Sequence, residues 1–211
     1  MHANVVRLRN TDADDLRSVA LLHREQFADH LLGCLPEALL VEFYRAFLAD
    51  TIFLVAEIDG SLSGFVLGGE DSVLRRNRSQ FMRNSRWQIM GAVIVHPALW
   101  PHVWKRAVAL WRPGASAISF TSVASTRLLS IAVAEAAKGQ GVAGSLLKAF
   151  EERLAKDGNY GLSVHADNTR AIGFYHKSGF IEEARCGGSV FYLKSTHAVP
   201  AVEGIDAHEG V

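Results

Sequence analysis

The chain has 211 residues, of which 49% are hydrophobic, and a formal net charge of zero. A chain of this size can bury one hydrophobic core, so we expect a single domain over residues 1–195. The balanced charge gives no overall field that would attract nucleic acid, which is therefore not an expected partner. Cys34 and Cys186 are far apart in the sequence and have no metal-like spacing, so we expect free thiols and no metal site. No apolar run approaches the roughly 20 residues that cross a bilayer, and the N-terminus lacks a signal-peptide core, so we expect a cytoplasmic protein.

The N-terminal part of the chain predicts one strand followed by two helices. Residues 5–8 favour a strand. Thr11 and Asp14 have the spacing of a capping box, with Asp in place of Glu, so we expect a helix from there to about Phe27. Pro36 suits the first position of a second helix, which continues with an apolar stripe.

A β-hairpin is expected next. Residues 51–58 and 62–69 are rich in apolar and β-branched side chains and flank an Asp59-Gly60 pair. Asp-Gly between two apolar runs is a strong hairpin signal because both residues tolerate positive φ. The order up to this point is therefore β-α-α-β-β.

Residues 71–126 form an unusual segment, which we expect to be a helical insertion between the third and fourth strands. Its first part is basic and its second part is apolar, ending in a loop or weak edge strand at residues 116–125. The basic residues of the first part are Arg75, Arg76, Arg78, Arg83 and Arg86, and the tryptophans are Trp87, Trp100, Trp104 and Trp111. We favour a helical hairpin that packs over the domain. The alternatives are a wall of a ligand pocket, a dimer contact, or shallow contact with a membrane surface through arginine and tryptophan.

The segment from residue 128 to 156 contains the most informative pattern. Apolar residues alternate over 128–133 as in a buried strand, glycines follow at Gly139, Gly141 and Gly144, and an amphipathic helix comes after them. Glycines permit positive φ and close backbone approach, and the first-turn amides of a helix attract anions. Lys138 adds a positive charge. We interpret the segment as a pyrophosphate-binding turn.

Three kinds of pyrophosphate site are candidates for this turn. A nucleotide-binding P-loop requires Gly-Lys-Ser/Thr, but Gly144 is followed by Ser145 without a lysine. The dinucleotide fingerprint GxGxxG is present as Gly139, Gly141 and Gly144, but residues 134–138 separate it from its strand, where the first glycine should follow almost at once. A third pattern has a basic or amide residue, two further residues, Gly, one residue, and Gly or Ala.

The C-terminal part predicts a strand at residues 160–165, then a helix that Asp167 or Asn168 caps and that ends at Gly179. A final hairpin follows over residues 180–186 and 189–194. We expect residues 196–211 to be a disordered tail.

Two separated motifs resemble the GNAT superfamily of acyl-CoA-dependent N-acyltransferases. Lys138, Gly141 and Ala143 fit the third pattern above, which is similar to motif A of that family, with Lys in place of the usual Arg or Gln. Residues 162–180, LSVHADNTRAIGFYHKSGF, resemble the second hallmark of the family. The resemblance implies an α/β (α+β) fold with a central mixed sheet of about six or seven strands flanked by helices.

The resemblance also implies acetyl-CoA as co-substrate. Strands 128–133 and 160–165 should diverge at their C-terminal ends, so that the pantetheine arm fills the gap and the pyrophosphate lies on the helix amides. The residues implied in binding are Ile131, Ala132, Val133, Lys138, Gly139, Gln140, Gly141, Val142, Ala143, Gly144, Ser145, Asn168 and Phe174. The alternative role of Asn168 is simply to cap its helix.

In the family, a tyrosine at the position of Tyr175 protonates the departing thiolate, so the resemblance implies this role for Tyr175, with buried packing as the alternative. The general base is not indicated clearly, because Arg127 and Ser163 stand where many relatives have glutamate. His165 and, through a water molecule, Glu135 are the candidates that we retain, beside Glu70 and Asp71.

The expected function is transfer of an acetyl group from acetyl-CoA to an amine by direct attack, without an acyl-enzyme. The acceptor would be an amino sugar, a small amine or a protein amine, and the protein a monomer or homodimer. The alternative is a non-catalytic CoA-binding sensor or scaffold that uses the tryptophan-rich insertion.

Overall fold

The computed structural model describes residues 5–28, 32–95, 100, 124–154 and 158–195. The strands are β1 (Arg7–Asn10), β2 (Ile52–Ile58), β3 (Ser61–Glu70), β4 (Thr126–Val133), β5 (Asn159–His165), β6 (Ile181–Cys186) and β7 (Ser189–Ser195). The helices are α1 (Leu16–Gln26), α2 (Glu37–Arg45), α3 (Asp71–Asn84), α4 (Arg86–Val95), the short 3-10 helix η2 (Glu135–Ala137), α6 (Val142–Glu151) and α7 (Thr169–Lys177).

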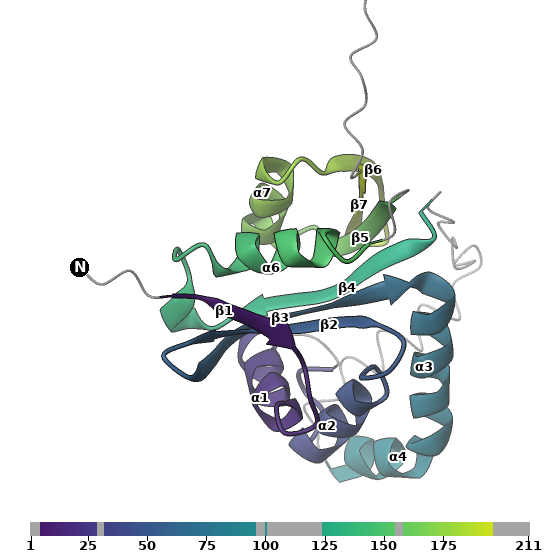
Figure 1. Ribbon diagram of the computed structural model, residues 1–211. Coiled ribbons are helices and arrows are strands. Elements are labelled where there is room, and N and C mark those ends of the chain that lie inside the picture. The colour runs from purple at the N-terminus through teal and green to yellow at the C-terminus, as the bar shows by residue number, and fades with distance from the viewer. Residues whose placement is uncertain (1–4, 29–31, 96–99, 101–123, 155–157, 196–211) are drawn as a thin grey trace, which may run out of the picture.

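The described strands form one mixed sheet of seven strands in the order β1-β2-β3-β4-β5-β7-β6. Every neighbouring pair is antiparallel except β4 and β5, which are parallel. Helices α6 and α7 cover one face of the sheet, and α1 and α2 cover the other (Figure 1). The sheet, the flanking helices and the helical insertion between β3 and β4 confirm the predicted fold.

The predicted capping box at the start of α1 is wrong in detail. The helix begins at Leu16, and no side chain caps it. The carboxylate of Asp12, and not the hydroxyl of Thr11, accepts hydrogen bonds from the backbone N–H groups of Asp14 and Asp15. The Thr11 hydroxyl is buried without a hydrogen-bond partner. Local spacing therefore located the turn but not the residue that stabilises it.

Arg9 connects β1, β2 and the start of α1. Its Nη1 and Nη2 atoms each lie 2.6 Å from an oxygen of the Asp15 carboxylate, and Nη2 also lies 2.6 Å from Glu57 Oε1. Burial raises the pKa of Asp15, but hydrogen bonds from the Arg9 guanidinium and the Asp12 N–H outweigh this effect, so the pKa lies below its ordinary value.

Asp15→Asn is expected to destabilise the protein by about 1–3 kcal/mol at pH 7, because it removes a charge-assisted pair and leaves Arg9 poorly compensated. Since folding lowers this pKa, the stabilisation is present above the unfolded value of about 3.9 and is lost as the pH falls below it. Urea unfolding of both proteins should therefore give a difference in unfolding free energy that is constant near neutral pH and shrinks as the pH falls below about 4. Asp14→Asn is the control, because Asp14 is exposed and its side chain is not part of this network. If the difference in unfolding free energy between the parent and Asp15→Asn does not change with pH, the ion pair of Asp15 with Arg9 does not stabilise the fold as assigned.

The β2–β3 hairpin is confirmed. Asp59 and Gly60 have φ values of 51° and 75°, as the primed two-residue turns require. The second helix begins one residue later than expected, at Glu37, with Pro36 as its N-cap. At the opposite edge of the sheet, β6 and β7 form the predicted C-terminal hairpin.

The insertion forms α3 and α4 over residues 71–95, whereas its last described residues, 124–126, lead into β4. Phe81 of α3 is buried and meets Phe43 of α2 edge-to-face, with ring centroids 5.4 Å apart. Ala92 of α4 packs with Leu35 and Leu39. Trp104, Trp111, residues 116–123 and the predicted tail lie outside the described residues. Among the helices that are described, none has the length and apolar character needed to span a bilayer.

Candidate functional site

The central feature of the site is a β-bulge in β4. Leu67 of β3 pairs with Ser130, whereas the next residue, Gly68, pairs with Leu128. Leu129 is therefore an extra residue without a partner on β3, and its side chain is 39% exposed. A bulge of this kind bends its strand and increases the local twist.

The bulge coincides with an opening between the two parallel strands. β5 pairs with β4 only at Thr126, opposite Tyr160, and at Arg127, opposite Gly161. Pairing stops directly before the bulge, so residues 128–133 have no partner on β5 (Figure 1). This confirms the prediction that the strands diverge. The exposed backbone edge of β4 can hydrogen-bond an extended ligand that has amide groups.

The end of β4 leads into a glycine turn at the start of α6. Gly139 and Gly141 have φ values of 83° and 79°. Gly141 is the N-cap and contributes no side-chain cap, and the first helical bond runs from the Ser145 N–H to its carbonyl. Within the described residues, the N–H groups of Val142, Ala143 and Gly144 thus have no backbone partner at the helix end. A Cβ at any of the three glycines would meet no atom within 4 Å, so this end of α6 borders open space that can receive an anion.

Two polar side chains around this turn already make contacts within the protein. The ammonium of Lys138 forms an ion pair with Glu135, and Gln140 Nε2 donates to the Ala136 carbonyl at 2.8 Å. The hydrogen bond from Lys138 lowers the pKa of Glu135. A lowered pKa makes the Glu135 carboxylate a weaker base, whereas its ion pair holds Lys138 beside the turn.

Asn168 and Phe174 lie on α7. The Asn168 side-chain oxygen accepts a hydrogen bond of 3.0 Å from the Ala171 N–H, so it caps the helix. Its side-chain NH₂ makes no hydrogen bond to the described part of the chain and remains available as a donor. Phe174 is half-buried and packs on Tyr175, with ring centroids 5.4 Å apart.

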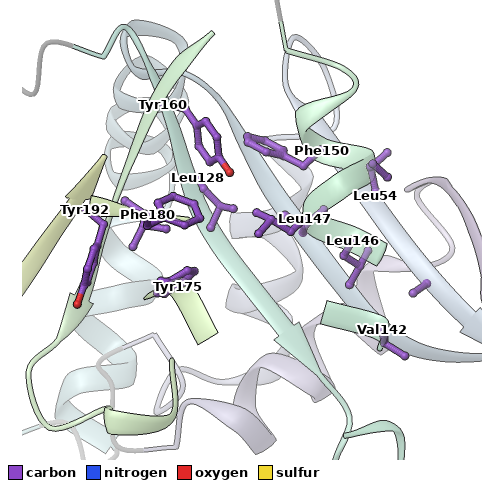
Figure 2. Close-up of a cluster of buried hydrophobic side chains, with 14 of the residues drawn as sticks. Leu54, Leu128, Val142, Leu146, Leu147, Phe150, Tyr160, Tyr175, Phe180 and Tyr192 are labelled. Carbon is purple, nitrogen blue, oxygen red and sulfur yellow. The ribbon is translucent and has the colours of Figure 1, made fainter. Parts of the chain in front are cut away.

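Tyr175 lies in an aromatic cluster on the α7 side of the sheet. Its ring centroid is 5.3 Å from that of Phe180 and 6.1 Å from that of Tyr192, and the same cluster includes Leu128 of β4 (Figure 2). Burial raises the pKa of Tyr175 to about 12, so the hydroxyl stays protonated at neutral pH. Within the described residues this hydroxyl makes no hydrogen bond, and it is not among the polar atoms that are fully buried without a partner. It is therefore a proton donor without an internal acceptor.

His165 ends β5 on the other side of the opening. Because Tyr160, Leu162 and Val164 face the α6–α7 core, strand alternation directs His165 to the α1–α2 face. Its Nδ1 atom accepts a hydrogen bond of 3.4 Å from the Asp167 backbone N–H and also lies 3.4 Å from an oxygen of the Asp167 carboxylate, and the side chain is about half exposed. The imidazole is thus accessible and lies beside the backbone N–H and the carboxylate of Asp167.

A buried polar group under β4 was missed by the sequence reasoning. His23 Nδ1 lies 2.6 Å from the hydroxyl of Tyr44, a fully buried residue. Burial raises the pKa of Tyr44, and a hydrogen bond with Ser130 of β4 lowers it by a smaller amount. The available signals were a histidine within an apolar helix and a serine within an apolar strand, but their association depends on tertiary packing.

The other carboxylates considered as bases lie at the paired end of β4. Glu70 pairs with Thr126, and Asp71 forms ion pairs with Arg75 and Arg127. A surface hollow of about 370 Å³ lined partly by Asp50, Glu70 and Arg153 is also at this end, away from the glycine turn. Neither carboxylate lies at the diverging end of the strands.

The fold and the site together define a class of α/β protein in which a sheet opens between two parallel strands, beside a glycine-initiated helix. The Acetyltransferase (GNAT) family model matches residues 20–180. The chain therefore belongs to the GNAT family of acyl-CoA-dependent N-acyltransferases.

Solved structures share this fold at low sequence identity. An N-acetyltransferase from Staphylococcus aureus Mu50 aligns with a TM-score of 0.58 and 15% identity, covering 89% of this chain and 100% of that one. Ard1 from Thermoplasma volcanium aligns with a TM-score of 0.53 and 19% identity, covering 92% and 99%. The PaiA N-acetyltransferase from Thermoplasma acidophilum, in complex with coenzyme A, aligns with a TM-score of 0.50 and 16% identity, covering 90% and 99%. No curated protein matches the sequence.

Proposed function

We propose that the protein transfers the acetyl group of acetyl-CoA to an amine within a ternary complex. The observation that carries this proposal is the opening between β4 and β5 after Arg127, which leads directly to the uncapped N-terminus of α6. A thioester held along β4 would have its pyrophosphate at the helix end and its acyl group within the opening.

Each part of the opening would bind one part of acetyl-CoA. The free edge of β4 at Ile131, Ala132 and Val133 would hydrogen-bond the pantetheine amides. The pyrophosphate would accept hydrogen bonds from the turn between Gly139 and Ser145, and Lys138 would contribute charge. On α7, the Asn168 amide would donate to the pantetheine arm, and Phe174 would pack against it.

The chemistry requires an attack and a proton transfer. The amine nitrogen bonds to the thioester carbonyl carbon, the C–S bond breaks, and the sulfur leaves as a thiolate. Tyr175 would protonate this thiolate, since its pKa of about 12 keeps it in the donor form and its hydroxyl is not engaged elsewhere in the described chain. No acyl-enzyme is required.

The attacking amine must also lose a proton. We assign this role to His165, because it projects to the α1–α2 face, where neither α6 nor α7 blocks the approach of an acceptor. Glu135, acting through a water molecule, is the second candidate, and its lowered pKa makes it the weaker one. The acceptor would be an amino sugar, a small amine or a protein amine, met in the cytoplasm by a monomer or homodimer.

The direct test combines calorimetry with an amine panel. Titration with acetyl-CoA and with CoA should give heat, and at least one amine should cause release of a thiol that a thiol reagent detects. Absence of heat with both ligands would refute the proposal. Binding without thiol release for any amine would instead support a non-catalytic CoA-binding module.

His165→Gln is expected to lower kcat/KM by about 10²–10⁴-fold near pH 7, the usual contribution of a general base. The deficit should become smaller as the pH approaches the pKa of the acceptor amine, because the amine then needs no base. Steady-state pH profiles of the variant and of Glu135→Gln would distinguish the two candidates. An equal deficit at every pH would argue that His165 does not act as a base.

A further inference from the structure

Helix α4 is apolar on all sides but is packed on only one. Its sequence, RWQIMGAVIV, has Arg86 and Gln88 as its only polar side chains. Ala92 is buried, with Ile89 and Val93 partly buried against α2 and the segment before it. A helix that is hydrophobic all round normally buries its whole circumference, so the second side of α4 requires a partner.

The opposite side of α4 exposes large apolar side chains, and we call this surface the α4 face. It consists of Trp87, Met90, Ile94 and Val95, together with Trp100, whose Nε1 donates to the Val93 carbonyl at 2.8 Å. These five side chains are between 54% and 71% exposed. Trp87, Met90 and Ile94 have the i, i+3, i+7 spacing of one helical stripe. Helix α4 forms an outer corner of the molecule beyond α3 (Figure 1).

Positive charge adjoins the α4 face and is not neutralised nearby. Of the arginines on α3 and α4, Arg75 and Arg76 are ion-paired with Asp71 and Asp50. The remaining three arginines make no ion pair with the described part of the chain: Arg78, Arg83 and Arg86. Arg86 lies 5.2 Å from the centre of the Trp87 ring.

The stretch of sequence that contains α3 and α4 has no acidic residue after Asp71. Residues 72–134 contain nine lysines and arginines and no aspartate or glutamate, although the whole chain is neutral. Among the described residues that line the groove between α2 and α4, Glu42 is the carboxylate, and it is paired with Arg45. The partner of the α4 face must therefore be both apolar and anionic.

We propose that the α4 face binds the surface of an anionic lipid bilayer. Tryptophan and aliphatic side chains would enter the boundary between headgroups and acyl chains, while Arg83 and Arg86 contact the headgroups. A second copy of the chain fits less well, because a symmetric contact would place the arginines of the two copies against one another. A nucleic acid would match the charge but leave the apolar side chains without an apolar partner.

Vesicle co-sedimentation of the full chain tests this proposal. Vesicles of phosphatidylcholine and phosphatidylserine at 3:1 should bind the protein at least about tenfold more tightly than vesicles of phosphatidylcholine alone. Because each arginine near an anionic surface contributes a factor of about five, Arg83→Gln with Arg86→Gln should weaken binding roughly 25-fold. Met90→Ser with Ile94→Ser should weaken it by about tenfold or more, since two apolar side chains no longer insert.

The matched control removes the same charge elsewhere. Arg24→Gln with Lys177→Gln changes two exposed residues outside the α4 face and should leave binding within about twofold. Thermal unfolding should show that every variant folds like the parent, as expected for exposed positions. The proposal does not use the acyl-transfer reaction, so it stands or falls separately from the proposed function.

Three results would overturn the proposal. The first is no binding to phosphatidylserine vesicles. The second is an equal loss of binding in the control variant, which would indicate attraction by overall charge alone. The third is a parent dimer that becomes monomeric on Met90→Ser with Ile94→Ser, which would assign the α4 face to a second copy.

Discussion

Gly144→Asp is expected to reduce acetyl-CoA binding by at least about 100-fold without destabilising the fold. Gly144 lies in the first turn of α6, and a side chain there would meet no protein atom within 4 Å. Aspartate has a higher helix propensity than glycine, and a negative charge in the first turn interacts favourably with the helix dipole. The same charge would stand in the place of the pyrophosphate and repel it. Calorimetry and thermal unfolding on one preparation would measure both effects.

Gly144→Ala is the matched control for this prediction. It should stabilise the protein by up to about 1 kcal/mol, because glycine within a helix costs roughly that amount relative to alanine. Its binding of acetyl-CoA should fall much less than that of the aspartate variant, since it adds no charge. If both variants bind acetyl-CoA as tightly as the parent, the pyrophosphate does not lie at the start of α6.

Tyr175→Phe is expected to lower kcat by about 10²–10⁴-fold while changing the Kd of acetyl-CoA and the thermal stability very little. The hydroxyl makes no hydrogen bond within the described residues, so its removal leaves the packing against Phe180 and Tyr192 intact. Single-turnover thiol release at saturating acetyl-CoA would isolate the chemical step.

Tyr192→Phe provides the comparison, because Tyr192 is buried in the same aromatic cluster and its hydroxyl contacts His176 Nε2 at 3.1 Å. It should lose some stability but retain kcat. If instead Tyr175→Phe turns over at the parent rate with a good acceptor, then the role of Tyr175 is packing alone.

Most of the fold was predictable because its signals are local. The Asp59-Gly60 turn, the strand at residues 128–133 and the Asn168 cap each depend on residues within a few positions of one another, and the structure confirms all three. The alternation expected within that strand is wrong at Leu129, where the bulge interrupts it and leaves the side chain exposed. The start of α1 was predicted incorrectly. Its N-cap residue, Asp15, does not cap the helix, and its carboxylate instead binds Arg9, which also binds Glu57, a residue 48 positions further on. Local sequence spacing does not predict a contact between residues that are so far apart in the chain.

The candidate site also combines local features that the sequence predicts with long-range contacts that it does not predict. The glycine turn follows from its own residues, and so does the cap formed by Asn168. The contact of Tyr44 with His23 and Ser130 could not be predicted, since it joins residues of α1, α2 and β4 that are far apart in the sequence. The general base remains a proposal because a strand predicts which face His165 occupies but not where the acceptor lies.

The extra residue in β4 has a consequence for how this protein tolerates change. We expect the opening to depend on chain length at Leu129 and not on the leucine side chain, which is partly exposed and has no partner on β3. Substitutions at Leu129 should therefore be tolerated. Deletion of this one residue should instead restore the regular register between β3 and β4 and allow β5 to pair with β4 along its whole length. At this position the number of residues, and not their identity, is therefore expected to determine whether the strands leave room for a ligand.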